Sequence, residues 1–398
     1  MITVSPRGLL AQISLVHLVS HLHIMALPAL LPVLRDALGV GFVELGVAIA
    51  VFNVVSALVQ APLGFLVDRW GARRMLRAAL LLGAASFGAL AIFPDYHLLL
   101  VAMVTAGIAN GVYHPADYSL LSRGIPARNM GRAFSIHTFA GFLGAALAPP
   151  LLLGSALWLT PRWAFAIAAL AGVIGCLVLM IGQHPPHWSA PAAPRAARSG
   201  TLAGTQVGTL VVLTLLFMLL SLSTGALDKF SVPALEQGFQ VPLSTGNLAL
   251  TAFLFASALG VLLGGVLADR TRHHGRLAAI AFALAALTVA LVATVSLPGW
   301  ALITAWAATG LLSGVVAPSR DMLVRAASAP GAEGRTFGIV STGFNLGGVV
   351  GPLLFGWLLD HGRAPMVLWA SVGFMVLTTL VVLAQERRPG SAAAAPTS

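Results

Sequence analysis

Charged residues are what this sequence has least of. Only 9% of its 398 residues are Asp, Glu, Lys or Arg, whereas 58% are hydrophobic. A soluble domain carries about 25% charged residues, so a chain with so few charges cannot cover a surface that faces water. The composition therefore excludes a soluble enzyme, a disordered protein, a coiled coil and a secreted disulfide scaffold.

Cysteine and lysine are almost absent. Cys176 is the only cysteine, so the chain can form no internal disulfide and has no redox or metal-thiolate motif. Lys229 is the only lysine, and the net charge of +10 comes from arginine. The arginines stand in short loops between apolar runs, so we expect no nucleic-acid partner. The sequence contains no P-loop, so we expect an ion gradient to supply the energy.

Twelve long apolar runs are what the sequence has instead. Each is long enough to cross a hydrocarbon core of about 30 Å as a helix. The runs lack the alternation of a β-strand, and backbone polar groups cannot stay unpaired in lipid, so we expect helices and no barrel. The prediction is an all-α integral membrane protein with twelve transmembrane helices. The runs lie at residues 9–34, 43–66, 75–93, 98–121, 133–154, 163–182, 207–230, 244–268, 277–297, 300–324, 336–359 and 366–384.

Loop charge predicts the orientation of these runs. Arginines gather at both termini and in the loops that follow the even-numbered runs, whereas the opposite loops hold only Arg35, Arg162 and Arg363. Because positive loops stay in the cytoplasm, we expect both termini to be cytoplasmic, in a bacterial-type inner membrane. The first run exceeds the roughly 7–15 apolar residues of a signal peptide, so we expect it to remain in the mature protein. Asp228 and Lys229, near the outer end of the seventh run, are expected to meet water.

Residues 183–206 divide the chain into two halves. This stretch holds four prolines among Ala, Ser and Gly, which is typical of a flexible linker. We predict an N-terminal half at 1–182, a cytoplasmic linker, a C-terminal half at 207–385 and a disordered tail at 386–398. Residues 132–154 are echoed by 335–357 at an offset of 203, in the same direction. The two six-helix halves are therefore expected to be parallel, pseudo-symmetric repeats.

A motif between the second and third runs indicates a family. Residues 64–74 read G-x-x-x-D-R-x-G-x-R-R, and 264–276 carry a weaker copy. With six plus six helices and a long central loop, the whole chain resembles the major facilitator superfamily, whose members alternate access between two halves. The resemblance implies that these residues form a gate at the cytoplasmic end. Alternatively, the arginines only fix the orientation of the helices in the membrane. The residues concerned are Gly64, Asp68, Arg69, Arg73, Asp269 and Arg270.

A narrower resemblance comes from three segments. Residues 20–32 (SHLHIMALPALLP), 51–64 (VFNVVSALVQAPLG) and 113–115 (YHP) are similar to the fosmidomycin-resistance-type branch of drug exporters. That branch has an acidic residue about one turn after its first-helix histidine, where this sequence has Met25. The small and Pro-rich run around Gly141, Gly144 and Pro149 also resembles exporter-type signatures.

Ionisable and polar residues inside the apolar runs are the candidate site. Such residues are expensive in lipid, so each is a functional candidate. Histidine titrates near pH 6.5 when unperturbed, which suits proton transfer in a chain with few intramembrane carboxylates. Alternatively, each histidine bonds to a backbone carbonyl freed by Pro28 or Pro115, and each asparagine only joins helices. His137 is a further intramembrane histidine. The candidates for substrate binding or proton coupling are His17, His21, Asn53, Asn110, His114 and Asn345.

Asp117 and Arg320 occupy matching positions in the repeat. At the offset of 203, the stripe Asn110, His114 and Asp117 (i, i+4, i+7, one helix face) maps onto the tenth run. We hypothesise that Asp117 and Arg320 pair across the halves when the cytoplasmic side closes, and we count both as gate residues with Asp321. The alternative is that Asp117 pairs with Arg73, and Arg320 with Asp321.

These observations favour a secondary active transporter that exports a small amphipathic or anionic compound by exchange for protons. The alternative is uptake, by symport or facilitated transport, of an organic anion or metabolite lined by His21, His114 and Arg320. We expect no enzyme activity, no cofactor and no metal site, because no Glu follows His17 in the manner of a metalloprotease. The expected partners are a small-molecule substrate, protons and the lipid bilayer, and the expected state is a monomer.

Overall fold

The computed structural model describes residues 4–126, 129–182, 207–271, 273–327 and 333–386, and these are helical over most of their length. Twelve helices among them are long and apolar enough to cross a membrane, which confirms the predicted all-α membrane fold. The linker predicted at 183–206 lies outside the described residues, as does the tail from 387 onward. Glu386, assigned to that tail, is instead the last residue of the final helix.

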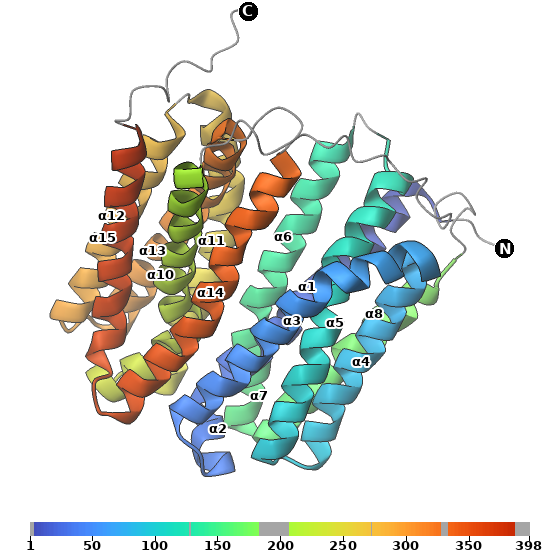
Figure 1. The fold of residues 1–398 in the computed structure, drawn as a ribbon. Coiled ribbons are helices and arrows are strands. Elements are labelled where there is room, and N and C mark those ends of the chain that lie inside the picture. Colours follow the sequence, from blue (N-terminus) through green and yellow to red (C-terminus); the bar gives the residue numbers. More distant parts are fainter. Residues whose placement is uncertain (1–3, 127–128, 183–206, 272, 328–332, 387–398) are drawn as a thin grey trace, which may run out of the picture. The chain divides into compact units, whose positions relative to one another are not determined.

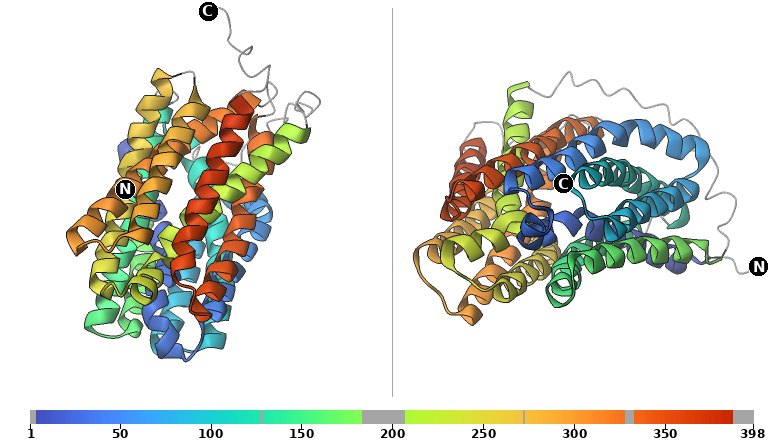
Figure 2. Two further views of the ribbon diagram at one scale, coloured as in Figure 1. Left: turned by 90° about the vertical axis from the view of Figure 1, so that its left-hand side faces the viewer. Right: turned by 90° about the horizontal axis from the view of Figure 1, so that it is seen from below.

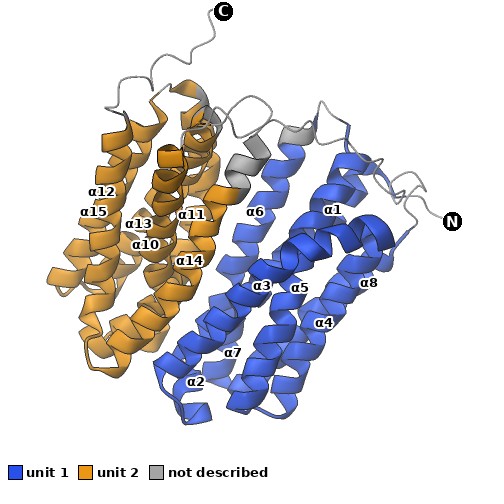
Figure 3. Cartoon of the chain, viewed as in Figure 1, with its two compact units in different colours: residues 1–193 blue, residues 194–398 orange. Residues whose placement is uncertain are grey.

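The chain divides into two compact units, Met1–Ala193 and Pro194–Ser398 (Figure 3). Within each unit the long helices run roughly side by side (Figure 1, Figure 2). Unit 1 contains α1 (Pro6–Ile24), α2 (Ala26–Leu38), α3 (Phe42–Trp70), α4 (Ala72–Ile92), α5 (Tyr96–Gly124), α6 (Met130–Ala148), the π-helical turn η2 (Pro149–Leu153), α7 (Gly154–Trp158) and α8 (Pro161–Met180). Unit 2 contains α10 (Val207–Phe239), α11 (Leu243–Arg270), α12 (His274–Thr294), α13 (Gly299–Ala327), α14 (Glu333–Asp360) and α15 (Pro365–Glu386).

The same helix pairs pack in both units. Unit 1 packs α1 against α6, α3 against α5 and α4 against α8, and unit 2 packs α10 against α14, α11 against α13 and α12 against α15. Two glycines related by the offset of 203 allow the same close helix contact in each unit. A Cβ at Gly107 would lie 2.8 Å from the carbonyl oxygen of Phe52, and a Cβ at Gly310 would overlap that of Phe253. Small residues let membrane helices approach this closely, so the internal repeat extends to the packing.

Two spans of unit 1 are interrupted. The first, Pro6–Leu38, breaks at Met25 into α1 and α2, just before Pro28. Proline lacks the backbone N–H that would bond four residues back, so it disturbs the helix at this point. In the fifth span, Pro149 and Pro150 open the π-helical turn η2. Both interruptions follow from prolines that are visible in the sequence.

Helix α10 corrects one prediction about unit 2. It continues through Pro233 to Phe239, whereas the apolar run was predicted to end at 230. Backbone groups in lipid are best satisfied within a helix, which favours this continuation. Asp228 and Lys229 therefore lie well inside the helix, not at its outer end, and their side chains pair at 2.9 Å. Cys176, on α8, is buried.

Candidate functional site

Unit 1 buries an aspartate among four histidines. Asp117 on α5 is 0% exposed, and His17 on α1 and His137 on α6 are almost as fully buried. His21 and His114 complete this group, which we call the histidine–aspartate cluster. Of its five members, all but His137 were predicted as site or gate residues.

The cluster is closely packed. Nδ1 of His17 lies 3.4 Å from Oδ2 of Asp117, and Nε2 of His137 lies 3.7 Å from the same oxygen. The ring of His17 stacks on that of His137 with 3.9 Å between centroids. Its centroid also lies 4.6 Å from that of His21 and 5.4 Å from that of His114. His17 is thus the central ring, in contact with the other three.

Helix geometry and one glycine position these side chains. His17 and His21 are one helical turn apart on α1, and His114 and Asp117 one turn apart on α5, so each pair shares a face. Gly141 on α6 lies directly against α1. A Cβ at this position would come within 2.7 Å of the His17 ring and 3.0 Å of the His21 ring. The absence of a side chain at Gly141 therefore leaves the room that the two histidines occupy.

Several buried polar atoms of the cluster lack a hydrogen-bond partner. These atoms are both carboxylate oxygens of Asp117, Nδ1 of His17, Nδ1 of His114 and both ring nitrogens of His137. Buried polar groups are nearly always hydrogen-bonded, so such a concentration calls for an explanation. The contacts of 3.4 and 3.7 Å are longer than charge-assisted hydrogen bonds. The arrangement suits a group of atoms that shares a mobile proton or binds a cation.

The ligand atoms of His17, Asp117 and His137 lie within 4.8 Å of one another, close enough to hold a metal ion. Imidazole nitrogen and carboxylate oxygen are common transition-metal ligands. A proton shared with Asp117 would satisfy the same atoms. The expectation that the protein uses no metal therefore stays a prediction.

The other predicted site residues have different surroundings. Asn110 donates from Nδ2 to Oγ of Ser56 at 2.7 Å and so joins α5 to α3, which is the alternative considered for the asparagines. Asn53 is partly exposed on α3, and Asn345 is exposed on α14 of unit 2. His23, the remaining histidine of α1, bonds through Nε2 to the carbonyl oxygen of Ala168 at 2.8 Å. His23 is thus bonded to a backbone carbonyl, but one on α8 and not one that Pro28 or Pro115 frees.

The predicted gate residues of unit 1 lie at the ends of α3, α4 and α5. Asp68 pairs with Arg123 at 3.8 Å. A Cβ on Gly64 would stand 3.8 Å from Pro115, so α3 and α5 are close at that point. Arg69 is exposed. Arg73 donates to the carbonyl oxygens of Leu179 and Gly182, and Asp117 lies beside His17 and His137 instead.

In unit 2, the Arg320 guanidinium bonds to Oδ1 of Asp321 at 2.8 and 2.9 Å, the partner considered for it within its own half. Arg270 is exposed at the end of α11. The side chain of Asp269 lies outside the described residues.

His137 is the member of the cluster that sequence reasoning left unassigned. It was visible as an intramembrane histidine, but it lies alone on α6 with no stripe of polar neighbours. Its position four residues before Gly141 was the available signal. Residues four apart share a helix face, and Gly141 was already marked by the exporter-like run.

Comparison with known proteins gives the family. The sequence description of the Major Facilitator Superfamily matches residues 13–228 and 213–398. Fosmidomycin resistance protein of Escherichia coli (strain K12) is 26% identical over 271 residues, 66% of this chain and 65% of that protein. Probable anion transporter 5 of Arabidopsis thaliana is 31% identical over 177 residues, 44% of this chain and 41% of that protein. These two alignments thus span less than two thirds of each relative.

Quinolone resistance protein NorA of Staphylococcus aureus (strain MSSA476) is 23% identical over 370 residues, 90% of this chain and 91% of that protein. Among solved structures, a bacterial homologue of the human lysosomal transporter Spinster, inward-facing and unoccupied, has a TM-score of 0.81. It is 15% identical, covers 96% of this chain and 97% of its own, and shows the fold. On the match along nearly its whole length and the twelve-span fold, the chain belongs to the major facilitator superfamily and is a multi-pass secondary transporter, not an enzyme.

Proposed function

We propose that this protein exports a small amphipathic or anionic compound across the cytoplasmic membrane in exchange for protons. The observation that carries the proposal is Asp117, wholly buried beside His17 and His137 with neither carboxylate oxygen hydrogen-bonded. A buried carboxylate without a partner is costly unless it takes up a proton or pairs with a cation. Asp117 is therefore suited to bind the coupling proton.

The histidines supply a route for that proton. His17 and His137 both approach Oδ2 of Asp117, so either ring can take the proton from it. The His17 ring also contacts His21 and His114, which extend the chain of titratable groups. Proton binding changes the charge of the cluster, and a change in charge shifts the balance between two conformations of similar free energy. In this mechanism the protonated and deprotonated clusters favour opposite-facing states.

Several further features enter the proposal as parts of the same transporter. Both termini and the linker are cytoplasmic, the membrane is the bacterial inner membrane and the protein acts as a monomer. The Asp68–Arg123 pair belongs to the cytoplasmic gate, and Asp269 and Arg270 are the counterparts of Asp68 and Arg69 in unit 2. The hypothesis that Asp117 and Arg320 pair across the halves also stays a prediction. If this pairing is the role of the two residues, combining Asp117→Arg with Arg320→Asp should restore transport that each single change abolishes, whereas loss of a proton-binding carboxylate predicts no recovery.

Export is favoured by the names of the relatives. The matched proteins include resistance proteins for fosmidomycin and for quinolones. The alternative is uptake of an organic anion, favoured by the probable anion transporters that also match.

Everted membrane vesicles separate these functions. With a proton gradient established, adding a quinolone, fosmidomycin or an organic acid should dissipate the gradient if the protein is an antiporter. The response should disappear in Asp117→Asn and persist in Asp95→Asn, an exposed carboxylate at the start of α5. Repeating the assay with a metal chelator should leave the response unchanged. Substrate flux without proton movement would contradict the proposal.

A further inference from the structure

Arg320 occupies in unit 2 the place that Asp117 occupies in unit 1. Asp117 lies on the fourth span and contacts residues of the first and fifth spans. Arg320 lies on the tenth span, and its guanidinium contacts residues of the seventh and eleventh. The internal repeat therefore surrounds an acid in one unit and a base in the other with the same three spans. The proton exchange proposed for unit 1 uses the acid, and it gives the base no part in binding the substrate.

Two aromatic rings hold the guanidinium. Its central carbon lies 5.0 Å from the ring centroid of Phe217 on α10 and 5.0 Å from that of Phe344 on α14. The two rings contact each other edge to face, with centroids 4.8 Å apart. A planar guanidinium is attracted to aromatic faces and keeps its N–H groups at its edge. The rings thus orient Arg320 without using its hydrogen-bond donors.

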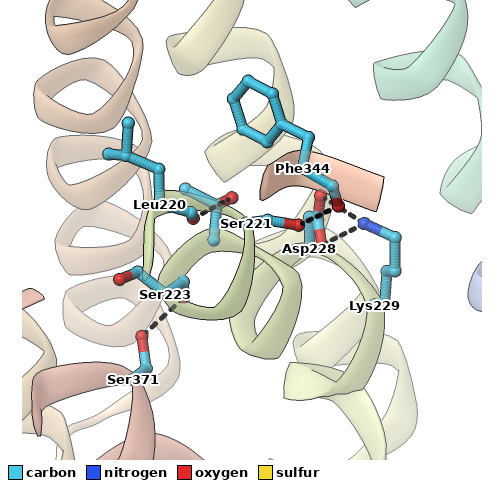
Figure 4. A network of polar contacts seen from close by, with 8 residues as sticks. Leu220, Ser221, Ser223, Asp228, Lys229, Phe344 and Ser371 are labelled. Atoms are coloured by element: carbon cyan, nitrogen blue, oxygen red, sulfur yellow. Dashed lines mark hydrogen bonds and ion pairs between the residues drawn. The ribbon is translucent and has the colours of Figure 1, made fainter. Parts of the chain in front are cut away.

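The ring pair is itself firmly held. Phe217 is fully buried. Oγ of Ser221 on α10 donates to the carbonyl oxygen of Phe344 at 3.1 Å, as the close-up of this region shows (Figure 4). A Cβ at Gly347 would come within 2.5 Å of the Ser221 side chain, so the two helices are in tight contact at this point. The aromatic support of Arg320 is preorganised.

Asp321 is a poor permanent partner for Arg320. One of its oxygens accepts from Nε and Nη2 at 2.9 and 2.8 Å. Adjacent residues on a helix do not face each other, and the Asp321 side chain is 47% exposed. An ion pair with one partner half exposed contributes little to stability. Among the described residues no partner is recorded for Nη1.

Apolar residues adjoin this cation. Arg320 is the only charged residue among those that line a pocket of unit 2 with room for about one water molecule, and its apolar neighbours there include Leu216, Leu220, Val316 and Leu323. The neighbouring Asp228 and Lys229 of α10 pair with each other. A ligand that carries one oxyanion on an apolar body would match an oriented guanidinium beside an apolar wall.

We propose that Arg320 binds the oxyanion of an apolar organic acid, either a carboxylate or a phosphonate. When no ligand is present, the Asp321 carboxylate pairs with the guanidinium in its place. The ligand displaces the Asp321 carboxylate, which turns towards water, and takes two N–H···O bonds from Arg320. This inference rests on the proposed function and specifies its substrate class as anionic. It requires no proton gradient, since it concerns binding alone.

Equilibrium binding to the purified full-length protein tests the site. Radiolabelled benzoate is the probe, phenylphosphonate the second oxyanion, and benzamide the neutral control of matched shape. We expect benzoate to bind, phenylphosphonate to compete and benzamide not to compete. Arg320→Gln should weaken benzoate binding about 10- to 100-fold, the loss of one or two charge-assisted hydrogen bonds. Asp321→Asn should tighten it, because the internal competitor is gone.

The tightening by Asp321→Asn keeps the proposal testable even if Arg320→Gln folds badly. Failure of both acids to bind the wild-type protein would overturn the inference, as would equal binding by wild type and Arg320→Gln, or competition by benzamide. Binding that follows these expectations in a protein that moves no protons would support this site and contradict the proposed proton exchange. The two ideas therefore fail separately.

Discussion

Nδ1 of His17 and Oδ2 of Asp117 lie 3.4 Å apart, although the two residues are one hundred positions apart in the sequence and belong to different spans. The contact is fully enclosed in unit 1, with 5% of one side chain exposed and none of the other. A proton moving between these atoms creates or removes a pair of opposite charges in a site that water does not screen. Such a contact links a chemical event to the packing of α1 against α5.

Replacing Asp117 by Asn should abolish proton coupling while the fold is kept. The amide has the same shape but neither takes up nor releases a proton between pH 5 and 8. We expect proton flux driven by substrate in proteoliposomes to fall at least tenfold, with a normal yield of folded protein. Asp95→Asn is the matched control, since Asp95 is exposed at the start of α5. Undiminished coupling in Asp117→Asn would remove the cluster from the mechanism.

Replacing Gly141 by Ala should damage the cluster through its packing. The added methyl would stand 2.7 Å from the His17 ring, so the ring must move. Overpacking of this kind costs about 1–3 kcal/mol, and we expect a lower melting temperature together with weaker coupling. Gly225→Ala, on α10, is the control because nothing lies within 4 Å of its Cβ position. It should leave stability unchanged or raise it slightly.

His23 should prove structural and His17 functional. His23 bonds to the carbonyl oxygen of Ala168 and packs on Phe87 at 4.9 Å. His23→Ala removes that hydrogen bond, worth about 0.5–1.5 kcal/mol, and leaves a cavity beside Phe87, so the melting temperature should fall while the ratio of protons to substrate stays the same. His17→Ala should change the ratio. If both variants alter coupling equally, the distinction between the two histidines is wrong.

The Asp228–Lys229 pair should show strong coupling in a double-mutant cycle. Each single change, Asp228→Asn or Lys229→Met, leaves one charge without its partner inside α10. The double change removes both charges, so it should destabilise less than the sum of the two. Contacting charges typically give interaction free energies of about 0.5–3 kcal/mol. Melting temperatures of the four proteins measure this, and additive effects would mean that water already screens the pair.

The start of α5 should respond to acid. Asp95 accepts the backbone N–H groups of His97 at 2.8 Å and Leu98 at 3.1 Å. These bonds, that of Leu98 above all, hold the pKa of Asp95 below its ordinary value of 3.8. A carboxyl group with a lowered pKa stabilises the folded state above its unfolded pKa and loses this effect as the pH falls through the folded value.

Asp95→Asn keeps the helix cap but removes the charge. The melting temperatures of wild type and variant should therefore differ at pH 7, begin to converge below about pH 4 and stop converging once the pH is below the folded pKa of Asp95. Asp95→Ala, which has no cap, should be less stable than Asp95→Asn at both pH values. A difference between wild type and Asp95→Asn that persists unchanged into acid would contradict this assignment.

Hydropathy was enough to predict twelve spans, because each span must satisfy its own backbone in lipid. The repeat offset was also visible in the sequence, and Gly107 and Gly310, which it relates, pack alike. The predicted end of the seventh span was wrong, because residues 231–239 (SVPALEQGF) have the composition of a loop. Packing and backbone hydrogen bonds nevertheless keep them helical. Composition alone does not register either effect.

The candidate site could be predicted only one helix at a time. Periodicity placed His17 with His21, and His114 with Asp117, on single faces. It could not say that α1, α5 and α6 turn those faces towards one another, because that depends on tertiary packing. The same limit applies to Asn110, which belongs to the stripe of Asp117 but meets Ser56 of α3 instead.

The lone cysteine has a practical value for spectroscopy. Cys176 is 5% exposed within α8, so thiol-specific spin labels should react slowly with the native protein and quickly with cysteines introduced at exposed positions. Trp158 and Trp300, which are 89% and 74% exposed, stand at the ends of spans in different units. Spin labels on cysteines introduced at these two sites would allow the distance between them to be measured by double electron–electron resonance. The transport cycle could then be followed in a nearly native background, one ligand and one pH at a time.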